Sequence, residues 1–432
     1  MSLSLAAPFA AEDRERPRLR AAARACAFAA AIVAFVISSM TLYSLGVLYD
    51  APGGSALGKL HPATYLAVLA LILEAASRAR PLAYLGALPL RFPGAALFLV
   101  NLALIIVYAS LFEHEPVTPL IDSFLVATIL LALYEDFSEG ERVALRRTLH
   151  VVMLANASLG ILEFAFHFRL TPYFAGGRPI LGDYRSTALF GHPLLNAGST
   201  ALYAAMLILN ADRALRTPLR LMLLAIQLVA LVAFGGRTSL ALASVVVAFG
   251  ALRALGELAG GRRFDLRAAL AAAVIAPLTI AAFAAAWLGG ALAPLLERFT
   301  ADRGSANTRF VIFDFFNVFS LDDILFGPEP GQLASLQNTF GVEYGIENGW
   351  LGLVFQYGAL MTAFFLVGLF ALIGELWRRA KLGAWAIVLL FLLQASSAAS
   401  LSVKSFEFNQ FAILMLVVFD CRAGRESQGA AP

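Results

Sequence analysis

The feature that most constrains this chain is a series of long apolar stretches that recur from Cys26 to Phe419. Most are about 16–25 residues long, and a helix of roughly 20 apolar residues crosses the hydrocarbon core of a bilayer. Composition agrees, because 60% of the residues are hydrophobic and only 14% are charged. We expect an all-α polytopic membrane protein with about twelve transmembrane helices, at 25–47, 62–77, 95–112, 120–136, 150–168, 193–210, 219–235, 238–255, 268–289, 348–374, 384–400 and 408–420.

The basic residues predict the orientation of these spans. With a cytoplasmic N-terminus, most of the 32 lysine and arginine residues fall in cytoplasmic segments, and every such segment is basic, as the positive-inside rule requires. Both termini are then expected in the cytoplasm. The predicted organisation is a basic N-terminal segment (1–24), a single transmembrane domain (25–420) with a large periplasmic loop at about 290–347, and a cytoplasmic tail (421–432).

Arg237 belongs to the minority of basic residues that this topology leaves on the outer side. It follows two glycines in the segment AFGGRTSLAL (Ala233–Leu242), in a turn between two predicted spans. A charge at membrane depth is costly and usually functional, and the planar arginine fork binds phosphate oxygens bidentately. We therefore expect Arg237 to hold a phosphate group. The alternative is a turn arginine that reaches lipid head groups.

The large outer loop contains a predicted amphipathic helix. Four apolar residues from Ile312 to Phe319 follow the i, i+3, i+4, i+7 spacing of one helical face. The helix is expected to begin at Asn307 and to lie at the membrane interface. Arg303 and Arg309 accompany this helix, and either a ligand phosphate or anionic lipid would attract them.

Four segments of the chain resemble, in this order, the O-antigen ligase and Wzy-type polysaccharide polymerase superfamily. They are YRSTALFGHPLLNAG (184–198), GGRTSLAL (235–242), NTRFVIFDFFNVFSLDDILFGPEPGQ (307–332) and IENGWLGLVFQYGAL (346–360). The resemblance implies a GT-C-related glycosyltransferase of the bacterial inner membrane. Its active site would face the periplasm and take a glycan from an undecaprenyl diphosphate carrier. The family commonly has His-Asn where this chain has Glu347-Asn348.

The resemblance also implies roles for individual residues. Arg237 would neutralise the leaving diphosphate, and Glu347 would act as the general base on the acceptor hydroxyl. For Glu347 the other interpretation is a helix-start residue that complements the helix dipole. The residues expected to contact substrate are Arg185, His192, Arg303, Arg309 and Asn348. Arg185 could instead be a loop residue paired with Asp183, and His192 fits a role in positioning its loop better than one in catalysis.

Three functions fit this pattern. A polymerase would move the growing glycan onto the next lipid-linked repeat unit, and the replacement of histidine by Glu347 favours this function, with an exopolysaccharide or O-antigen as product. A ligase would move the glycan onto lipid A core or another acceptor. A flippase or transporter for lipid-linked sugars has a similar helix count, but transporters are commonly built from repeats, and this chain shows none.

Cofactors and several partner classes are not expected. The histidines are scattered without ligand spacing, so no metal site is predicted. No glycine-rich phosphate loop is present, so the donor must arrive already activated, and no cofactor is expected. The basic residues are divided between two membrane faces, which argues against nucleic acid. The expected partners are the lipid-linked glycan, membrane lipid and other polysaccharide assembly proteins.

Overall fold

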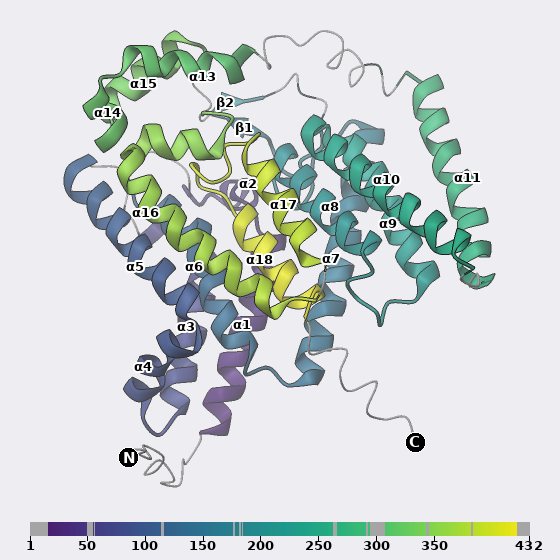
Figure 1. Cartoon of the computed structure of the whole chain (residues 1–432), viewed down its shortest axis with the longest axis horizontal. Helices are drawn as coiled ribbons and strands as arrows, with labels where there is room; N and C mark the ends of the chain where they lie inside the picture. The colour runs from purple at the N-terminus through teal and green to yellow at the C-terminus, as the bar shows by residue number, and fades with distance from the viewer. Residues whose placement is uncertain are drawn as a thin grey trace.

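The computed structural model describes residues 16–49, 55, 57–113, 116–175, 178–180, 183, 185–261, 266–290, 293, 307–342, 345–381 and 383–420. Their regular structure is helical (Figure 1), apart from the antiparallel pair β1 (Phe174–Ala175) and β2 (Arg178–Pro179). The expectation of an all-helical chain is confirmed at this level.

Each predicted span overlaps a helix. Six helices, α1, α5 continued by η2, α7, α9, α10 and α16, are long and apolar enough to cross a membrane, and five shorter apolar helices, α3, α6, α8, α17 and α18, accompany them. The helices are α1 (Pro17–Val36), α2 (Ser39–Ser44), η1 (Leu57–Lys59), α3 (Pro62–Ser77), α4 (Pro81–Arg91), α5 (Pro93–Tyr108), η2 (Ala109–Glu113), α6 (Thr118–Tyr134), α7 (Glu139–Phe166), α8 (Pro193–Ile208), α9 (Thr217–Phe234), α10 (Arg237–Ala259), α11 (Leu266–Leu288), α13 (Asn307–Val318), α14 (Leu321–Phe326), α15 (Pro330–Thr339), α16 (Gly349–Arg379), α17 (Ala384–Ala395) and α18 (Glu407–Val418).

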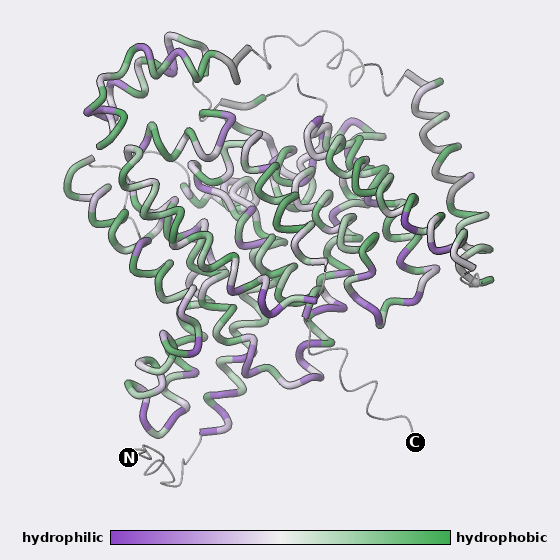
Figure 2. The backbone as a smooth tube through the Cα atoms, viewed as in Figure 1, coloured by the Kyte–Doolittle hydropathy of each residue, from purple (hydrophilic) through white to green (hydrophobic). Residues whose placement is uncertain are grey.

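The outer surface of the bundle is apolar over much of its height. Figure 2 shows hydrophobic residues along the middle of the helices and hydrophilic ones gathered toward their ends. On α5, Leu97, Val100 and Leu104 are 43%, 57% and 52% exposed, and on α10 Val245 and Leu252 are 66% and 67% exposed. Contiguous apolar surface of this kind is stable when lipid covers it.

Three predicted spans are interrupted, one of them, 348–374, by the bend at Gly358 described below. The first, 25–47, breaks after α1, because the Ser38 side chain accepts a hydrogen bond from the Thr41 N–H and starts α2 as a separate helix. The eleventh, 384–400, ends at Ala395, and residues 396–406 form a non-helical connection to α18. Serine competes with the backbone for hydrogen bonds and so favours caps and turns over helix interiors.

The predicted interfacial helix is present as α13, whose described residues run from Asn307 to Val318. A capping box between Ser320 and Asp323 starts α14 as a second helix. Part of the apolar face is covered by protein, since Phe315 is fully buried and its ring lies 5.4 Å from that of Phe355 on α16. Phe313, by contrast, is 55% exposed.

A bend in α16 positions α13, α14 and α15, which together we call the outer block, against the bundle. Gly358 has φ 77° and ψ 155°, which divides α16 into two helical pieces. A Cβ atom at this position would lie 2.5 Å from the carbonyl oxygen of Leu325 at the end of α14. Only glycine allows both the backbone conformation and the close approach.

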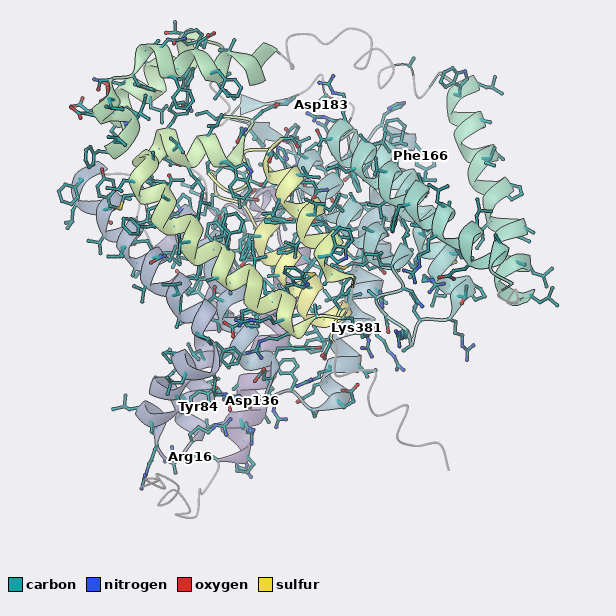
Figure 3. The ribbon with its side chains drawn as sticks, viewed as in Figure 1. Arg16, Tyr84, Asp136, Phe166, Asp183 and Lys381 are labelled. Carbon is teal, nitrogen blue, oxygen red and sulfur yellow. The ribbon has the colours of Figure 1, made fainter. Side chains whose placement is uncertain are left out.

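One end of the bundle is tied together by ion pairs. The Glu74 carboxylate is 1% exposed and lies 2.5 Å from Arg78 and 3.7 Å from Arg20, while Asp136 lies 3.4 Å from Arg78. Figure 3 shows Asp136 and Tyr84 at this end and Asp183 at the other. Further pairs here join Arg24 to Glu141, Arg142 to Asp420, Arg146 to Asp212, and Arg91 and Arg379 to Glu135. We call this the ion-paired end.

Candidate functional site

A cavity of about 590 Å³ lies at the opposite end of the bundle, which we call the cavity end. Its lining contains four of the residues that the sequence predicted to act on substrate: Arg185, His192, Arg237 and Glu347. They come from the loop before α8, the cap of α8, the start of α10 and the segment before α16. The fold therefore gathers in one place side chains that are far apart in the sequence.

Several helices begin at this cavity. Lining residues stand at the first residue or N-cap of four helices: His61 (α3), His192 (α8), Arg237 (α10) and Glu407 (α18). The first turns of helices carry unpaired N–H groups and a partial positive charge. This convergence favours a negatively charged group in the cavity.

The two glycines before Arg237 have separate structural roles. Gly235 ends α9 with φ 63°, and an added Cβ would lie 2.9 Å from the Cγ of Arg185. An added Cβ on Gly236 would lie 2.4 Å from the Cβ of Ala197 on α8. The pair thus makes the left-handed turn and lets both Arg185 and α8 approach, which brings Arg185 and Arg237 into the same lining.

Arg185 is held by its own loop. Its Nε donates to the two carboxylate oxygens of Asp183 at 2.8 and 3.1 Å, so the pairing considered from the sequence is present. Arg169 donates to the carbonyls of Ile180 and Arg185 at 3.1 Å each, and buried Glu163 accepts backbone N–H groups from the turn that follows. The loop is firmly positioned, and Arg185 offers the cavity a partly neutralised guanidinium.

His192 is a capping residue. Its Nδ1 accepts from the Leu194 N–H at 3.2 Å, so the ring proton lies on Nε2, which is 3.2 Å from the Tyr173 hydroxyl. Burial, helped by the charge of Arg185, lowers the pKa of His192 to about 4. A neutral ring with both nitrogens engaged is suited to fixing the loop, in line with the positioning role favoured from the sequence.

Glu347 is placed by the residues that follow it. The Asn348 side-chain oxygen caps α16 by accepting hydrogen bonds from the Trp350 and Leu351 N–H groups, at 3.1 Å each. That oxygen is therefore used within the helix, and Asn348 is not part of the cavity lining. Gly349 and Gly352 pack so closely on the 395–402 segment that a Cβ at either would lie 3.0 Å or less from it. This contact fixes Glu347 at the edge of the cavity.

The lining also contains residues that the sequence did not single out. The connection 396–406 contributes several small and polar residues, and Gln394, Ser400 and Glu407 are 2%, 8% and 4% exposed. The only signal for them was the concentration of serine and alanine between two apolar stretches. Because that segment was assigned partly to a span, its role was missed.

Two predicted residues cannot be placed in the site. Arg303 and the Arg309 side chain lie outside the described residues, although the Arg309 backbone belongs to α13.

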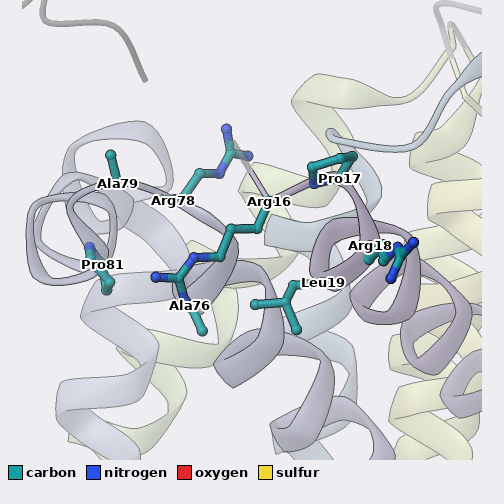
Figure 4. Close-up of a pocket in the computed structure, with 8 residues that line it drawn as sticks. All are labelled: Arg16, Pro17, Arg18, Leu19, Ala76, Arg78, Ala79 and Pro81. Carbon is teal, nitrogen blue, oxygen red and sulfur yellow. The ribbon is translucent and has the colours of Figure 1, made fainter. Parts of the chain in front are cut away.

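A second cavity, at the ion-paired end, is lined by Arg16, Arg18, Arg78 and apolar neighbours (Figure 4). Among the described residues, its lining includes no carboxylate or histidine for proton transfer and none of the predicted site residues. Within the described part of the chain, no cluster of three His, Cys, Asp or Glu side chains could hold a metal ion.

No protein-family model, curated protein or solved structure matches this chain.

Proposed function

We propose that this chain polymerises undecaprenyl-diphosphate-linked repeat units at the periplasmic face of the bacterial inner membrane. The observation that carries the proposal is the meeting of Arg185, Arg237 and Glu347 in one cavity. Transfer of a glycan from a lipid diphosphate needs two kinds of side chain, one that binds phosphate and one that accepts a proton. The segments that supply them are those that resemble the O-antigen ligase and Wzy-type superfamily.

The arginine side of the cavity fits the leaving group. When the bond between the anomeric carbon and the diphosphate breaks, negative charge develops on the phosphate oxygens. Arg237 and the N–H groups at the start of α10 supply fixed donors for that charge, so the transition state is stabilised more than the ground state. Arg185, oriented by Asp183, provides a second contact.

Glu347 fits the role of general base. The acceptor hydroxyl attacks the anomeric carbon, its proton passes to the Glu347 carboxylate, and undecaprenyl diphosphate departs with the bonding electrons. His192 is a poorer candidate, because Nδ1 already accepts a backbone hydrogen bond and Nε2 carries the proton. Arg303 and Arg309 remain proposed glycan or lipid contacts from the outer block and the segment that precedes it.

The polymerase differs from a ligase only in its acceptor, and the preference rests on Glu347 in place of the histidine that the superfamily commonly has. In this proposal the ion-paired end faces the cytoplasm, and the cavity end faces the periplasm. Other polysaccharide assembly proteins would deliver the lipid-linked units to this face.

The test uses the purified chain in proteoliposomes with lipid-linked repeat units extracted from the producing strain. A ladder of products supports the polymerase, and transfer to added lipid A core identifies a ligase. Movement of the lipid-linked unit across the bilayer without a new glycosidic bond would overturn both and identify a flippase. Arg237→Ala provides the inactive control.

A further inference from the structure

A polar group of residues in the cavity has no role in the steps above. Gln394, Ser400 and Glu407 come from the end of α17, the 396–406 connection and the start of α18, whereas the arginines come from the loop before α8 and from α10. All three side chains are at least nine-tenths buried. The cavity is therefore lined by two chemically different sets of groups.

Two of these residues carry buried polar atoms without hydrogen bonds. The Gln394 Nε2 donates to the Gly198 carbonyl at 3.3 Å, but its Oε1 has no partner among the described residues. The Ser400 hydroxyl lies beside the Glu407 carboxyl and has no other partner among the described residues. A buried polar atom without a partner is costly, so such atoms at a cavity indicate a missing ligand.

Glu407 forms no ion pair within the described part of the chain, and, unlike buried Glu163, its carboxyl accepts no backbone N–H there. Gly198 on α8 makes room for it, since an added Cβ there would lie 2.9 Å from Glu407 Oε1 and 3.7 Å from Gln394 Oε1. The carboxyl and the amide thus lie close together beside a position where any larger residue would intrude.

Two amides in the first turn of α18 are held by the protein itself. The Gln410 Oε1 accepts from Ser199, and its Nε2 donates to the Ala34 carbonyl at 3.1 Å. Asn409 accepts from the Ala127 N–H at 2.9 Å and donates to the Asp122 carbonyl at 2.7 Å. Gln410 thus lines the cavity with both ends of its amide already bonded, whereas the Glu407 carboxyl is not held in this way.

We infer that Gln394, Ser400 and Glu407 form a subsite for the hydroxyl groups of the sugar attached to the diphosphate. A sugar hydroxyl both donates and accepts, which matches an amide oxygen, a serine hydroxyl and a carboxyl group at once. The inference rests on the proposed function. It assigns the sugar to the α17–α18 side of the cavity and the diphosphate to the arginine side.

The experiment compares lipids with and without the sugar. The full chain in nanodiscs is titrated with bare undecaprenyl diphosphate and with undecaprenyl diphosphate bearing glucose, galactose or N-acetylglucosamine. We expect wild type to bind at least one sugar-bearing lipid more tightly than the bare lipid. Gln394→Leu and Glu407→Gln should each weaken that binding about 5- to 30-fold, which is the size of one or two hydrogen bonds. Neither variant should weaken the binding of bare undecaprenyl diphosphate.

Gln227→Leu is the matched control. Gln227 is also fully buried, donates through Nε2 to a backbone carbonyl at 3.2 Å and has an Oε1 without a partner, but it does not line the cavity. It should leave the binding of both lipids unchanged. Thermal unfolding of each variant confirms that the folded protein is being titrated.

The failures are distinguishable. The subsite is refuted if Gln394→Leu and Glu407→Gln change the affinity for both lipids equally or for neither. It is also refuted if wild type binds no sugar-bearing lipid more tightly than the bare lipid. In both cases diphosphate binding stands. If Arg237→Ala leaves binding of the bare lipid unchanged, or wild type binds neither lipid, the proposed function fails, and the subsite fails with it.

Discussion

At the ion-paired end, the buried Glu74 carboxylate lies 2.5 Å from Arg78, and buried Asp212 lies 3.4 Å from Arg146. At the cavity end, Glu407 is as deeply buried and has no cation beside it among the described residues. A buried charge costs several kcal/mol unless it is paired, so a buried carboxyl without a cation favours its protonated form, which at a cavity can hydrogen-bond a ligand. Substitutions at the two ends should therefore fail in different ways: loss of stability at one and loss of activity at the other.

The largest effect is expected at Glu347. Glu347→Gln keeps the size of the side chain but removes the proton acceptor, so glycan transfer should slow by about 10²–10⁴-fold while donor binding is retained. Glu347→His should recover part of the rate, because imidazole accepts a proton near neutral pH. Single-turnover transfer and lipid binding are measured on the same preparations. A Gln variant that polymerises at the wild-type rate would reduce Glu347 to a helix-start residue.

Arg237 should produce a somewhat smaller loss with a different signature. Arg237→Ala should lower transfer about 10²–10³-fold and weaken diphosphate binding as well, since a fixed donor to the developing charge is removed. Arg237→Lys should be intermediate, because lysine supplies charge without the bidentate fork. Arg18→Ala, in the other cavity, is the matched control and should change neither quantity. Equal effects of the Arg18 and Arg237 variants would erase the distinction between the two ends.

Glu74→Gln tests the ion-paired end. Removing one partner of a buried pair leaves arginine charge uncompensated, and the partial exposure of Arg20 and Arg78, 24% and 17%, reduces the cost to about 2–3 kcal/mol of unfolding free energy. Chemical denaturation in detergent measures this loss. The transfer rate per folded molecule should be unchanged. A variant that keeps its stability and loses activity would contradict the structural role of this cluster.

The smallest effect is a pH dependence of stability at the cavity end. Because the pKa of His192 is about 4 in the folded chain and about 6.5 when unfolded, protons bind preferentially to the unfolded chain below pH 6.5. Stability should fall by about 1 kcal/mol at pH 6 and further toward pH 4. His192→Asn keeps a helix cap but cannot titrate, so its thermal midpoint should fall less between pH 7 and 5. Parallel curves for the two proteins would rule out this contribution.

Much of the helical framework could be predicted because apolar length is a local property. The turn at Gly235 and Gly236 was also readable, since a glycine pair acts over a few residues. The breaks near Ser38 and after Ala395, in contrast, were not predicted. Short runs of serine and alanine barely change the hydropathy of a window that long apolar residues dominate.

The candidate site was only partly predictable. Arg237 stood out because it carries a charge between two apolar stretches, and Glu347 because it stands where the superfamily that the chain resembles commonly has histidine. Gln394 and Glu407 gave no comparable signal, because their meaning depends on the space that Gly198 leaves on another helix. Such a contact joins positions about two hundred residues apart, since Gln394 reaches the Gly198 carbonyl across a separation of 196, and no local pattern encodes it.

The bend at Gly358 brings α16 back into contact with the end of α14. A Cβ there would lie 2.6 Å from the Gly327 nitrogen, so the chain leaves this point after α14 and returns to it after the first piece of α16, with Glu347 in between. A segment whose two ends already touch can be lengthened or exchanged at little cost in closure entropy. The segment between Gly327 and Gly358 can thus accept insertions or exchanges while the helices beneath it stay the same.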